Sequence, residues 1–402
     1  MNPRERLLTA LDHREPDRVP FDLGSTQVTG IHMVAYRHLR QALGLPPVQA
    51  RLCDHIQQLA LPDEDVLERL GVDVRGLFPL NSHTPPPTPP LRDGKHVGVL
   101  EEDDEGWVYH DEWGITYRRP KPDGLYFTIT QVPLGDPQLS VRDIERHAWP
   151  DMADPQRIAG LRELAERYRA AGYAVVLKSP FAGIFEMAQR IVGMENCLTM
   201  MAAEPKLAEA LFDKLLELKL AFWEMALPRL ADPSSGSGQA MIDVVAEFDD
   251  YGTQTSLLIS PRMFRQLLKP RLKVLFERIR QLAPQAKRFF HSCGNVRPLL
   301  PDFIEVGVEI LNPVHIRAAG MEPTALKRDF GDALVFWGGG VDTQDVLPHG
   351  TPQEVRDDVR RNIEALAPGG GFVFSAVHNI QPDVPPQNLI AMWEALQEYG
   401  AL

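Results

Sequence analysis

From residue 155 onward the sequence alternates helical patterns with short apolar segments, and this alternation restricts the possible folds more than any other feature. The apolar segments are rich in Val, Ile, Leu and Phe, as in AVVLKSP, KRFFHSCG, VEILNPV, LVFWGGG and FVFSAV. Short, continuously apolar strands separated by helices are typical of a parallel sheet covered on both faces. The sequence therefore predicts a series of parallel βα units.

The number of predicted strands favours a closed barrel. Seven or eight are present when RVPFDL (18–23) and VDVRGLF (72–78) are counted. That number fits an α/β fold of the (β/α)8 TIM type better than an open sheet, and we expect one domain over residues 1–402. The predicted helices cover residues 3–12, 33–43, 63–70, 155–172, 181–191, 194–202, 204–230, 261–284, 295–306, 323–329, 352–366 and 386–399.

Residues 97–131 depart from this pattern and predict an antiparallel β-hairpin region inserted in the barrel. Aromatic and β-branched residues alternate there with polar ones, and DDEG and PDG are turn signals. The Pro-rich stretch 81–95 that precedes it is interpreted as an extended excursion rather than a domain boundary.

Charge and composition exclude several classes of partner. The 402 residues include 42 Lys and Arg against 55 Asp and Glu, a formal net charge of -13. Nucleic-acid binders carry basic surfaces, and an anionic membrane would repel this chain. The first residues lack an apolar signal region, and no apolar run approaches ~18 residues, so we expect a cytoplasmic protein without a membrane span. Three cysteines are too few for a disulfide framework.

Polar residues stand where the predicted strands end, which is where a parallel barrel carries its active site. The candidates for binding substrate are Lys178, Asn312, Asp342 and Gln344. The candidates for acid–base work are Glu247, Asp249 and Asp250, which stand at the end of one strand. Two alternatives stay open: Asp250 as a helix N-cap and Lys178 as a solvated side chain.

The sequence HSCG predicts a metal site. Residues i and i+2 of an extended segment point to the same side, so His291 and Cys293 can bind one ion, with the cysteine as thiolate. His378 ends a later strand and adds a third ligand, which leaves one position open as in catalytic zinc sites. The alternative is a buried structural pair at 291 and 293.

Several segments spread over nearly the whole chain resemble the uroporphyrinogen decarboxylase superfamily and, within it, the cobalamin-dependent methyltransferase branch. They are RERLLTALDHREPDRVPFDLG near the start, VLERLGVD, ISPRMFRQLLKPRLKVLF (259–276), FFHSCGNVRPLLPDFIEVGVEILNPVH (289–315), WGGGVDTQDVLPHGTPQEVRDDV (337–359) and HNIQPDVPPQN (378–388). The resemblance implies a (β/α)8 barrel with its site at the C-terminal mouth.

The chain departs from the decarboxylases where their substrate is held. They carry an Arg pair in an R-Q-A-G-R loop and an Asp in an F-S-D-I strand end, whereas the matching stretches here are RVPFDLGSTQ and GLFPLNS, with Leu80 near the Asp position. The methyltransferase branch carries H-x-C and a late Cys, whose position here resembles His378. The decarboxylases carry a His near this point without binding metal, so the resemblance leaves a substrate-binding role for His378 open. The resemblance therefore implies methyl transfer rather than porphyrinogen decarboxylation.

The resemblance also implies Zn2+ as cofactor and cobalamin carried by a partner corrinoid protein, since no D-x-H-x-x-G motif occurs here. The other partner is a small-molecule methyl donor or acceptor, and a homodimer stays open. The segment HNIQPDVPPQN favours methoxylated aromatics, and hence O-demethylation. The alternatives are transfer from methylcobalamin to a thiol or tetrahydrofolate, a metal-free decarboxylase or lyase acting on a non-porphyrin acid, and a non-catalytic corrinoid-delivery protein.

Overall fold

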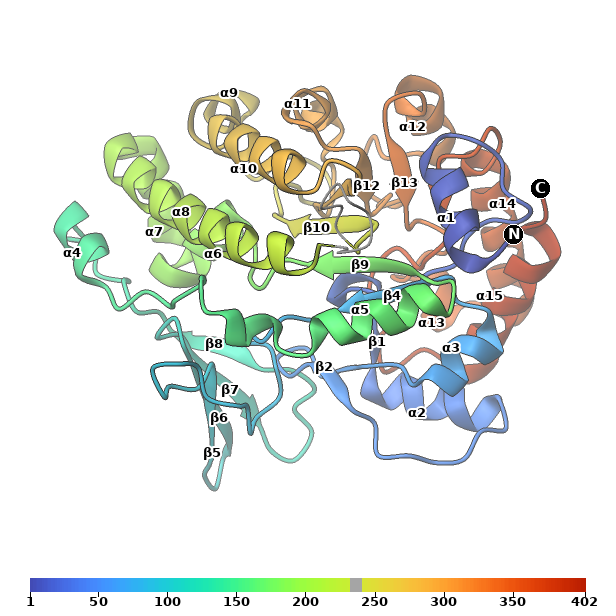
Figure 1. Cartoon of the computed structure of the whole chain (residues 1–402), viewed down its shortest axis with the longest axis horizontal. Helices are drawn as coiled ribbons and strands as arrows, with labels where there is room; N and C mark the ends of the chain where they lie inside the picture. Colours follow the sequence, from blue (N-terminus) through green and yellow to red (C-terminus); the bar gives the residue numbers. More distant parts are fainter. Residues whose placement is uncertain (232–240) are drawn as a thin grey trace.

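A parallel sheet of seven strands forms the centre of the molecule (Figure 1), in the order β14-β13-β12-β11-β10-β9-β4. The structure, a computed structural model, describes residues 1–231 and 241–402. The strands are β4 (Val74–Leu77), β9 (Ala174–Lys178), β10 (Val244–Phe248), β11 (Lys287–His291), β12 (Ile310–Asn312), β13 (Val335–Trp337) and β14 (Phe372–Val373). The order follows the chain from β4 to β14, as the predicted series of βα units requires.

The extended residues 20–22 join the two edges of this sheet. The N–H of Phe374 donates to the carbonyl of Pro20 at 2.8 Å, and the N–H of Asp22 donates to the carbonyl of Phe374 at 2.9 Å. On the other side the N–H of Asp73, just before β4, donates to the carbonyl of Phe21 at 2.9 Å. The segment RVPFDL therefore takes the eighth strand position, and the predicted TIM-type α/β fold is confirmed.

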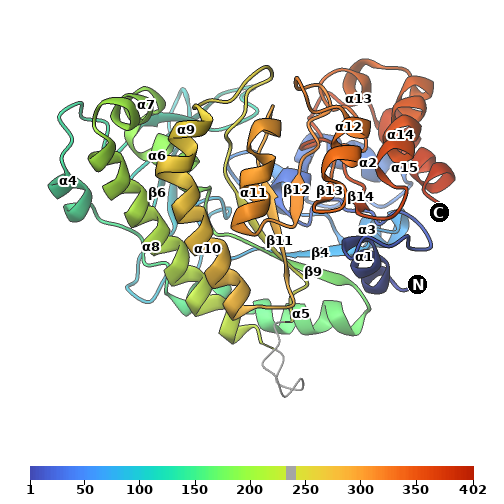
Figure 2. The same cartoon turned by 90° about the horizontal axis from the view of Figure 1, so that it is seen from above.

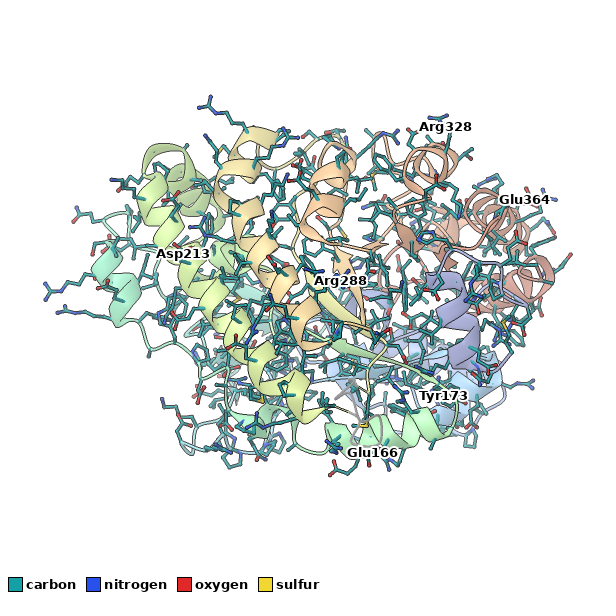
Figure 3. The ribbon with its side chains drawn as sticks, turned by 45° about the horizontal axis from the view of Figure 1, so that its top comes forward. Glu166, Tyr173, Asp213, Arg288, Arg328 and Glu364 are labelled. Atoms are coloured by element: carbon teal, nitrogen blue, oxygen red, sulfur yellow. The ribbon has the colours of Figure 1, made fainter. Side chains whose placement is uncertain are left out.

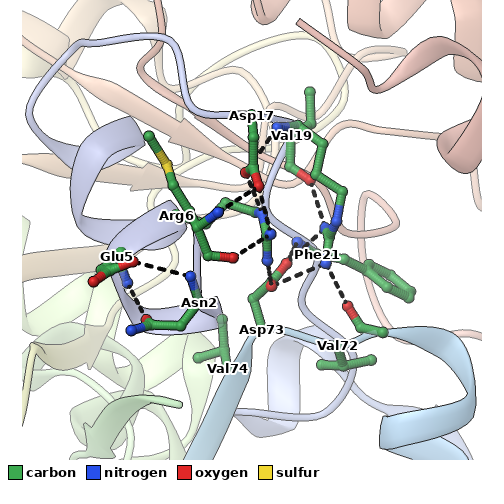
Figure 4. Close-up of polar contacts among 12 residues, drawn as sticks. Asn2, Glu5, Arg6, Asp17, Val19, Phe21, Val72, Asp73 and Val74 are labelled. Atoms are coloured by element: carbon green, nitrogen blue, oxygen red, sulfur yellow. Dashed lines mark hydrogen bonds and ion pairs between the residues drawn. The ribbon is translucent and has the colours of Figure 1, made fainter. Parts of the chain in front are cut away.

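Asp73 anchors this closing segment (Figure 4). Its buried carboxylate accepts hydrogen bonds from Arg6 Nη1 at 2.6 Å, from Arg18 Nη1 at 2.8 Å and from the backbone N–H of Phe21 at 2.8 Å. Because the carboxylate is removed from water, each of these charge-assisted bonds is stronger than at the surface. One acidic side chain thus ties the first helix and the closing segment to β4.

Helices cover the outside of the sheet (Figure 2). They are α1 (Pro3–Leu11), α2 (Met33–Ala42), α3 (Glu64–Leu70), α4 (Val141–Arg146), α5 (Leu161–Ala170), α6 (Ile184–Val192), α7 (Met194–Ala203), α8 (Pro205–Arg229), α9 (Pro261–Met263), α10 (Lys269–Leu282), α11 (Leu300–Val306), α12 (Pro323–Phe330), α13 (Val346–His349), α14 (Pro352–Leu366) and α15 (Pro386–Tyr399). Their outer faces are charged, and Glu166, Asp213, Arg328 and Glu364 are exposed there (Figure 3). No helix in the described residues is long and apolar enough to cross a bilayer.

Alternation along the strands separates two apolar cores. Val244, Ala246 and Phe248 belong to one buried cluster with the corresponding residues of the other strands, which fills the inside of the sheet. Val245 belongs to the larger cluster between sheet and helices. Since successive strand residues face opposite sides, every second residue of a strand points into the barrel and the others point at a helix.

The connection between β4 and β9 contains the predicted insertion. It forms a four-stranded antiparallel sheet of β5 (Gly98–Glu102), β6 (Gly106–Asp111), β7 (Thr116–Pro120) and β8 (Thr128–Gln131). A second small sheet has the order β1-β3-β2, with β1 (Ile31–His32), β2 (Leu52–Asp54) and β3 (Leu59–Ala60). The hairpin region predicted at 97–131 is therefore confirmed, with two strands more than a single hairpin has.

Three predicted helices are shorter or interrupted. Gly160, at φ 76°, is the N-cap of α5 and follows a short 3-10 turn at Pro155–Ile158, so the helix predicted over 155–172 is divided. A π-helical turn at Phe264–Leu268 interrupts the helix predicted over 261–284, just before Pro270. The helix predicted over 295–306 begins as a 3-10 turn at Arg297–Leu299. The short helices α4 and α13 were not predicted.

Candidate functional site

A cavity of about 230 Å³ lies where the strands end. Phe248 and His291 end two neighbouring strands and are paired in register, and both line it. The remaining lining residues are Gln27, Val28, Gln57, His83, Lys178, Ser179, Pro180, Phe181, Ala182, Glu186, Arg190, Asp250 and His378. The C-terminal mouth of the barrel is therefore a small, mostly polar hollow, as the fold predicts.

The three predicted ligand residues lie close together at this cavity. One ligand atom from each of His291, Cys293 and His378 lies within 4.8 Å of the other two. The Sγ of Cys293 is 3.4 Å from Nε2 of His291, and the two imidazole rings have centroids 5.5 Å apart. Ligands of a tetrahedral zinc ion lie about 3.5 Å from one another, so small side-chain rotations suffice to close the set around one ion.

His291 is held in the orientation that a ligand needs. Its Nδ1 is 2.5 Å from Oδ1 of Asn312, whose own Nδ2 donates to the carbonyl of Trp337 at 2.7 Å. The amide oxygen only accepts, so Nδ1 of His291 carries the proton and Nε2 keeps its lone pair toward Cys293. Metal-binding histidines commonly have such a partner for the second nitrogen. The structure thus places Asn312, predicted to bind substrate, behind His291.

The loop that carries Cys293 is fixed from two sides. The N–H of Cys293 donates to Oδ1 of Asp250 at 2.8 Å, and the N–H of Gly294 donates to Nδ1 of His315 at 3.0 Å. Gly294 has φ 81°, and a Cβ added there would lie 2.5 Å from the carbonyl oxygen of Thr253. Glycine is therefore required beside Cys293 both by conformation and by space.

Burial controls protonation in the cluster. It lowers the pKa of His378 to about 3, helped by the nearby His291 and His315. No hydrogen bond from a described residue reaches the His378 ring, so the neutral imidazole has a free lone pair. Burial, together with the Asp250 and Glu186 carboxylates, raises the pKa of the Cys293 thiol. A cation among the three side chains offsets that cost for the thiolate.

Of the three predicted acids, only Asp250 lines the cavity. Its Oδ1 lies 3.7 Å from Nε2 of His291. Glu247 faces the other side of β10, where it is buried against Nζ of Lys219 and Nε1 of Trp223, both at 2.6 Å. Asp249 accepts hydrogen bonds from the N–H groups of Phe185 and Glu186 and so caps the start of α6. The helix-capping role considered for Asp250 thus falls to Asp249.

The other predicted substrate residues separate into two groups. Lys178 ends β9 inside the barrel and lines the cavity, with 3% of its surface exposed. Asp342 lies elsewhere: it accepts from the N–H of Gln344 at 2.9 Å and lines a separate hollow with Arg317. Gln344 itself is exposed. The structure does not bring Asp342 and Gln344 to the mouth cavity.

A polar chain that the sequence analysis missed forms another wall of the cavity. Glu186 and Arg190, one turn apart on α6, pair at 2.5 Å. Nη1 of Arg190 lies 3.3 Å from Nε2 of His83, and Nδ1 of His83 lies 2.7 Å from Oδ2 of Asp54. Arginine only donates, so His83 accepts at Nε2 and donates at Nδ1. The signal for Glu186 and Arg190 was the i, i+4 spacing of an acidic and a basic residue in the helix that follows β9.

These features define the class of the protein as a parallel α/β barrel with a metal-competent His-Cys-His cluster at its C-terminal mouth. The model of the uroporphyrinogen decarboxylase (URO-D) family matches residues 129–399, which is more than half of the chain. The chain therefore belongs to the uroporphyrinogen decarboxylase family.

Two kinds of relative are similar to it in sequence. A uroporphyrinogen decarboxylase of Pseudoalteromonas translucida is 36% identical over 75 residues, 19% of this chain and 20% of that protein. A methylated-thiol–coenzyme M methyltransferase of Methanosarcina mazei is 25% identical over 266 residues, 62% of this chain and 61% of that protein. The chain thus aligns with less than two thirds of the length of these curated relatives.

A solved structure shares the fold over the full length. It is a methyltransferase from Methanosarcina mazei, with a TM-score of 0.62 and 21% identity, and the match covers 99% of both chains. At this identity the likeness shows a common fold.

Proposed function

We propose that this protein is a zinc-dependent methyltransferase that moves a methyl group between a small methylated substrate and the cobalamin of a partner corrinoid protein. The observation that carries the proposal is the His291–Cys293–His378 cluster at the barrel mouth. The similarity to the Methanosarcina mazei methyltransferase over 62% of the chain supports the reaction class. Methoxylated aromatics are the favoured substrates, because Phe181, Phe248 and Val28 line the cavity with apolar surface.

His291, Cys293 and His378 would hold the zinc ion, which would supply Lewis acidity to the oxygen, nitrogen or sulfur atom that carries the methyl group. The residues of the chain do the remaining work. Asn312 holds His291 with its lone pair toward the ion, and the backbone contact with Asp250 positions Cys293. When the bond between the methyl carbon and an ether oxygen breaks, its electron pair stays on the oxygen. Asp250 lines the cavity and can donate a proton to that oxygen. Glu247 fixes α8 through its contacts with Lys219 and Trp223, and Asp249 fixes the start of α6 as its cap.

Zinc analysis combined with a methyl-transfer assay tests the proposal. Purified protein is expected to hold about one zinc per chain and to methylate cob(I)alamin from at least one member of a panel of methoxyarenes and methylamines. His291→Ala, Cys293→Ala and His378→Ala should each lose zinc and activity. Cys197→Ala is the matched control, since Cys197 is fully buried in α7 and does not line the cavity.

Two outcomes would contradict the proposal. Folded wild-type protein without zinc that decarboxylates a small acid would support the metal-free alternative. Zinc-loaded protein that binds a corrinoid protein yet transfers no methyl group in either direction would support a corrinoid-delivery role. Transfer only from methylcobalamin to a thiol or tetrahydrofolate would keep the class and reverse the direction.

A further inference from the structure

Lys178 is a buried lysine whose Nζ has no partner in contact. It lines the mouth cavity, only 3% of the residue is exposed, and no hydrogen bond or ion pair joins its Nζ to any described residue. The centroid of the Phe78 ring lies 5.7 Å from Nζ. A buried ammonium without an acceptor is costly, so its retention inside the barrel needs an explanation.

The acidic groups around Lys178 are already engaged. Glu186 pairs with Arg190 at 2.5 Å. Asp54, whose charge acts on Lys178, accepts from Nδ1 of His83 at 2.7 Å and from the N–H of Gln57 at 2.8 Å. Asp250 contacts the Cys293 loop beside the metal-competent cluster. None of these three carboxylates lies within ion-pair distance of Nζ, so the donor groups of Lys178 have no acidic partner in contact.

The same cavity contains an unpaired amide. Oε1 of Gln27 is buried and has no hydrogen-bond partner among the described residues. A side-chain amide carries an oxygen that accepts and an NH2 group that donates, so Gln27 can offer either to a ligand. Two polar side chains, one from the 3-10 turn Gln27–Thr29 and one from β9, therefore lack partners inside one hollow.

We propose that Lys178, together with Gln27 of the same cavity lining, binds a carboxylate of the methylated substrate, so that the substrate is a small aromatic acid rather than a neutral ether or amine. The proposal rests on the proposed function, which places the methylated atom at the His-Cys-His cluster of the same cavity. Phe248, Phe181 and Val28 supply apolar surface for a ring. A volume of about 230 Å³ is below the ~300–1,000 Å³ that drug-sized ligands occupy, which suits a single ring.

The charged side chains that line the cavity favour a singly charged acid over a phosphate ester. Arg190 is committed to Glu186, so Lys178 is the one cation of the lining that has no acidic partner in contact among the described residues. One ammonium neutralises one carboxylate, whereas a dianionic phosphate would leave a second charge buried near Asp250 and Asp54. The ligand chemistry is therefore that of a benzoate.

Binding of unreactive probes tests this subsite separately from methyl transfer. Benzoate and benzamide have similar size and differ in charge. Calorimetry with zinc-loaded wild-type protein should give benzoate an affinity about 10- to 100-fold higher than benzamide, the range of one charge-assisted hydrogen bond. Lys178→Met keeps the length of the side chain and removes its charge, and it should abolish that preference. Lys178→Arg should retain part of it, and Lys273→Met, at an exposed position, is the matched control.

Each outcome decides between the two proposals. A benzoate preference that depends on Lys178 supports the subsite even if no methyl donor reacts, in which case only the proposed function fails. Equal affinity for benzoate and benzamide in folded wild-type protein overturns the subsite, even if neutral methoxyarenes react. A benzoate preference that survives in zinc-loaded Lys178→Met also overturns it, because the anion is then bound elsewhere, at the metal for example.

Discussion

Nδ1 of His291 and Oδ1 of Asn312 lie 2.5 Å apart across the neighbouring strands β11 and β12. The two residues are paired in the register of the sheet, so the backbone itself sets their separation. The hydrogen bond fixes which nitrogen of His291 stays free for a metal ion. A residue at the end of one strand thus prepares a ligand at the end of the next.

Asn312→Leu should weaken zinc binding about 10- to 100-fold, because His291 loses the partner that sets its tautomer and orientation. The measurement is a competition titration against a chelator of known zinc affinity. Asn312→Asp is the informative control: it keeps an acceptor for Nδ1 and should retain most of the affinity. Equal zinc affinity in wild type and Asn312→Leu would show that the contact with Asn312 does not orient His291.

The ion pair between Lys219 and Glu247 should be essential for folding stability. Both side chains are buried, and Nζ of Lys219 also donates to Oγ of Ser179 and to the carbonyl of Phe181. Lys219→Met leaves a buried carboxylate without its cation, and we expect a loss of about 3–5 kcal/mol in the free energy of unfolding. Denaturant unfolding followed by circular dichroism measures it.

A matched surface pair and a double variant serve as controls for this prediction. Lys214 and Glu217 form an exposed i, i+3 pair on α8, and Lys214→Met should cost at most about 0.5 kcal/mol. Lys219→Met combined with Glu247→Gln should recover part of the lost stability, because the neutral amide still accepts from Trp223. A double variant less stable than Lys219→Met would contradict the electrostatic explanation.

Much of the fold could be predicted because the relevant signals are local and periodic. Long helices such as α8 and α14 repeat apolar residues with the helical period, and the buried strands of the parallel sheet are continuously apolar. The interruption at Gly160 was less predictable, since a glycine in a helical pattern ends a helix only when packing requires a left-handed residue there.

Site residues could be predicted where a short motif alone fixes the direction of their side chains. They were harder to predict where the register between strands fixes that direction. His291 and Cys293 share a side of one segment, so their proximity follows from spacing alone. Glu247 and Phe248 are adjacent, and only the register of β10 against β11 determines that Phe248 faces the cavity while Glu247 faces α8. His83 was not predicted, because its place beside Arg190 depends on the path of the Pro-rich excursion over the barrel mouth.

The stability of the protein should fall with acid through His55, which links β2 to the inserted sheet. Its ring packs against Phe127 and Tyr109, with centroids 4.7 and 5.2 Å away. Burial, aided by the charge of Arg119, lowers the pKa of His55 to about 4. The unfolded chain binds its proton near pH 6.5, so below that pH the unfolded state gains protons that the folded state does not.

The stability that His55 contributes is therefore present above about pH 6.5 and is lost as the pH falls toward 4. Between pH 7 and pH 5 the wild type should lose about 2 kcal/mol more than His55→Phe, which keeps an aromatic ring and has no proton to bind. Urea unfolding at a series of pH values measures the difference. Parallel stability profiles for the two proteins would show that His55 is protonated as easily in the folded state as in the unfolded one.

Gly294 should control metal binding through the backbone beside Cys293, and Gly160 provides a matched comparison. Both glycines are left-handed, at φ 81° and 76°, but a Cβ at Gly160 meets nothing within 4 Å, whereas one at Gly294 would lie 2.5 Å from the carbonyl oxygen of Thr253.

Gly160→Ala should cost about 1 kcal/mol of stability through strain alone and leave zinc affinity unchanged. Gly294→Ala must move the loop and should lower zinc affinity at least about 10-fold, because ligand geometry tolerates little displacement. Thermal unfolding and the zinc competition titration, applied to both variants, separate the two effects: equal zinc affinity in both would mean that the Cys293 loop adapts to the added methyl group.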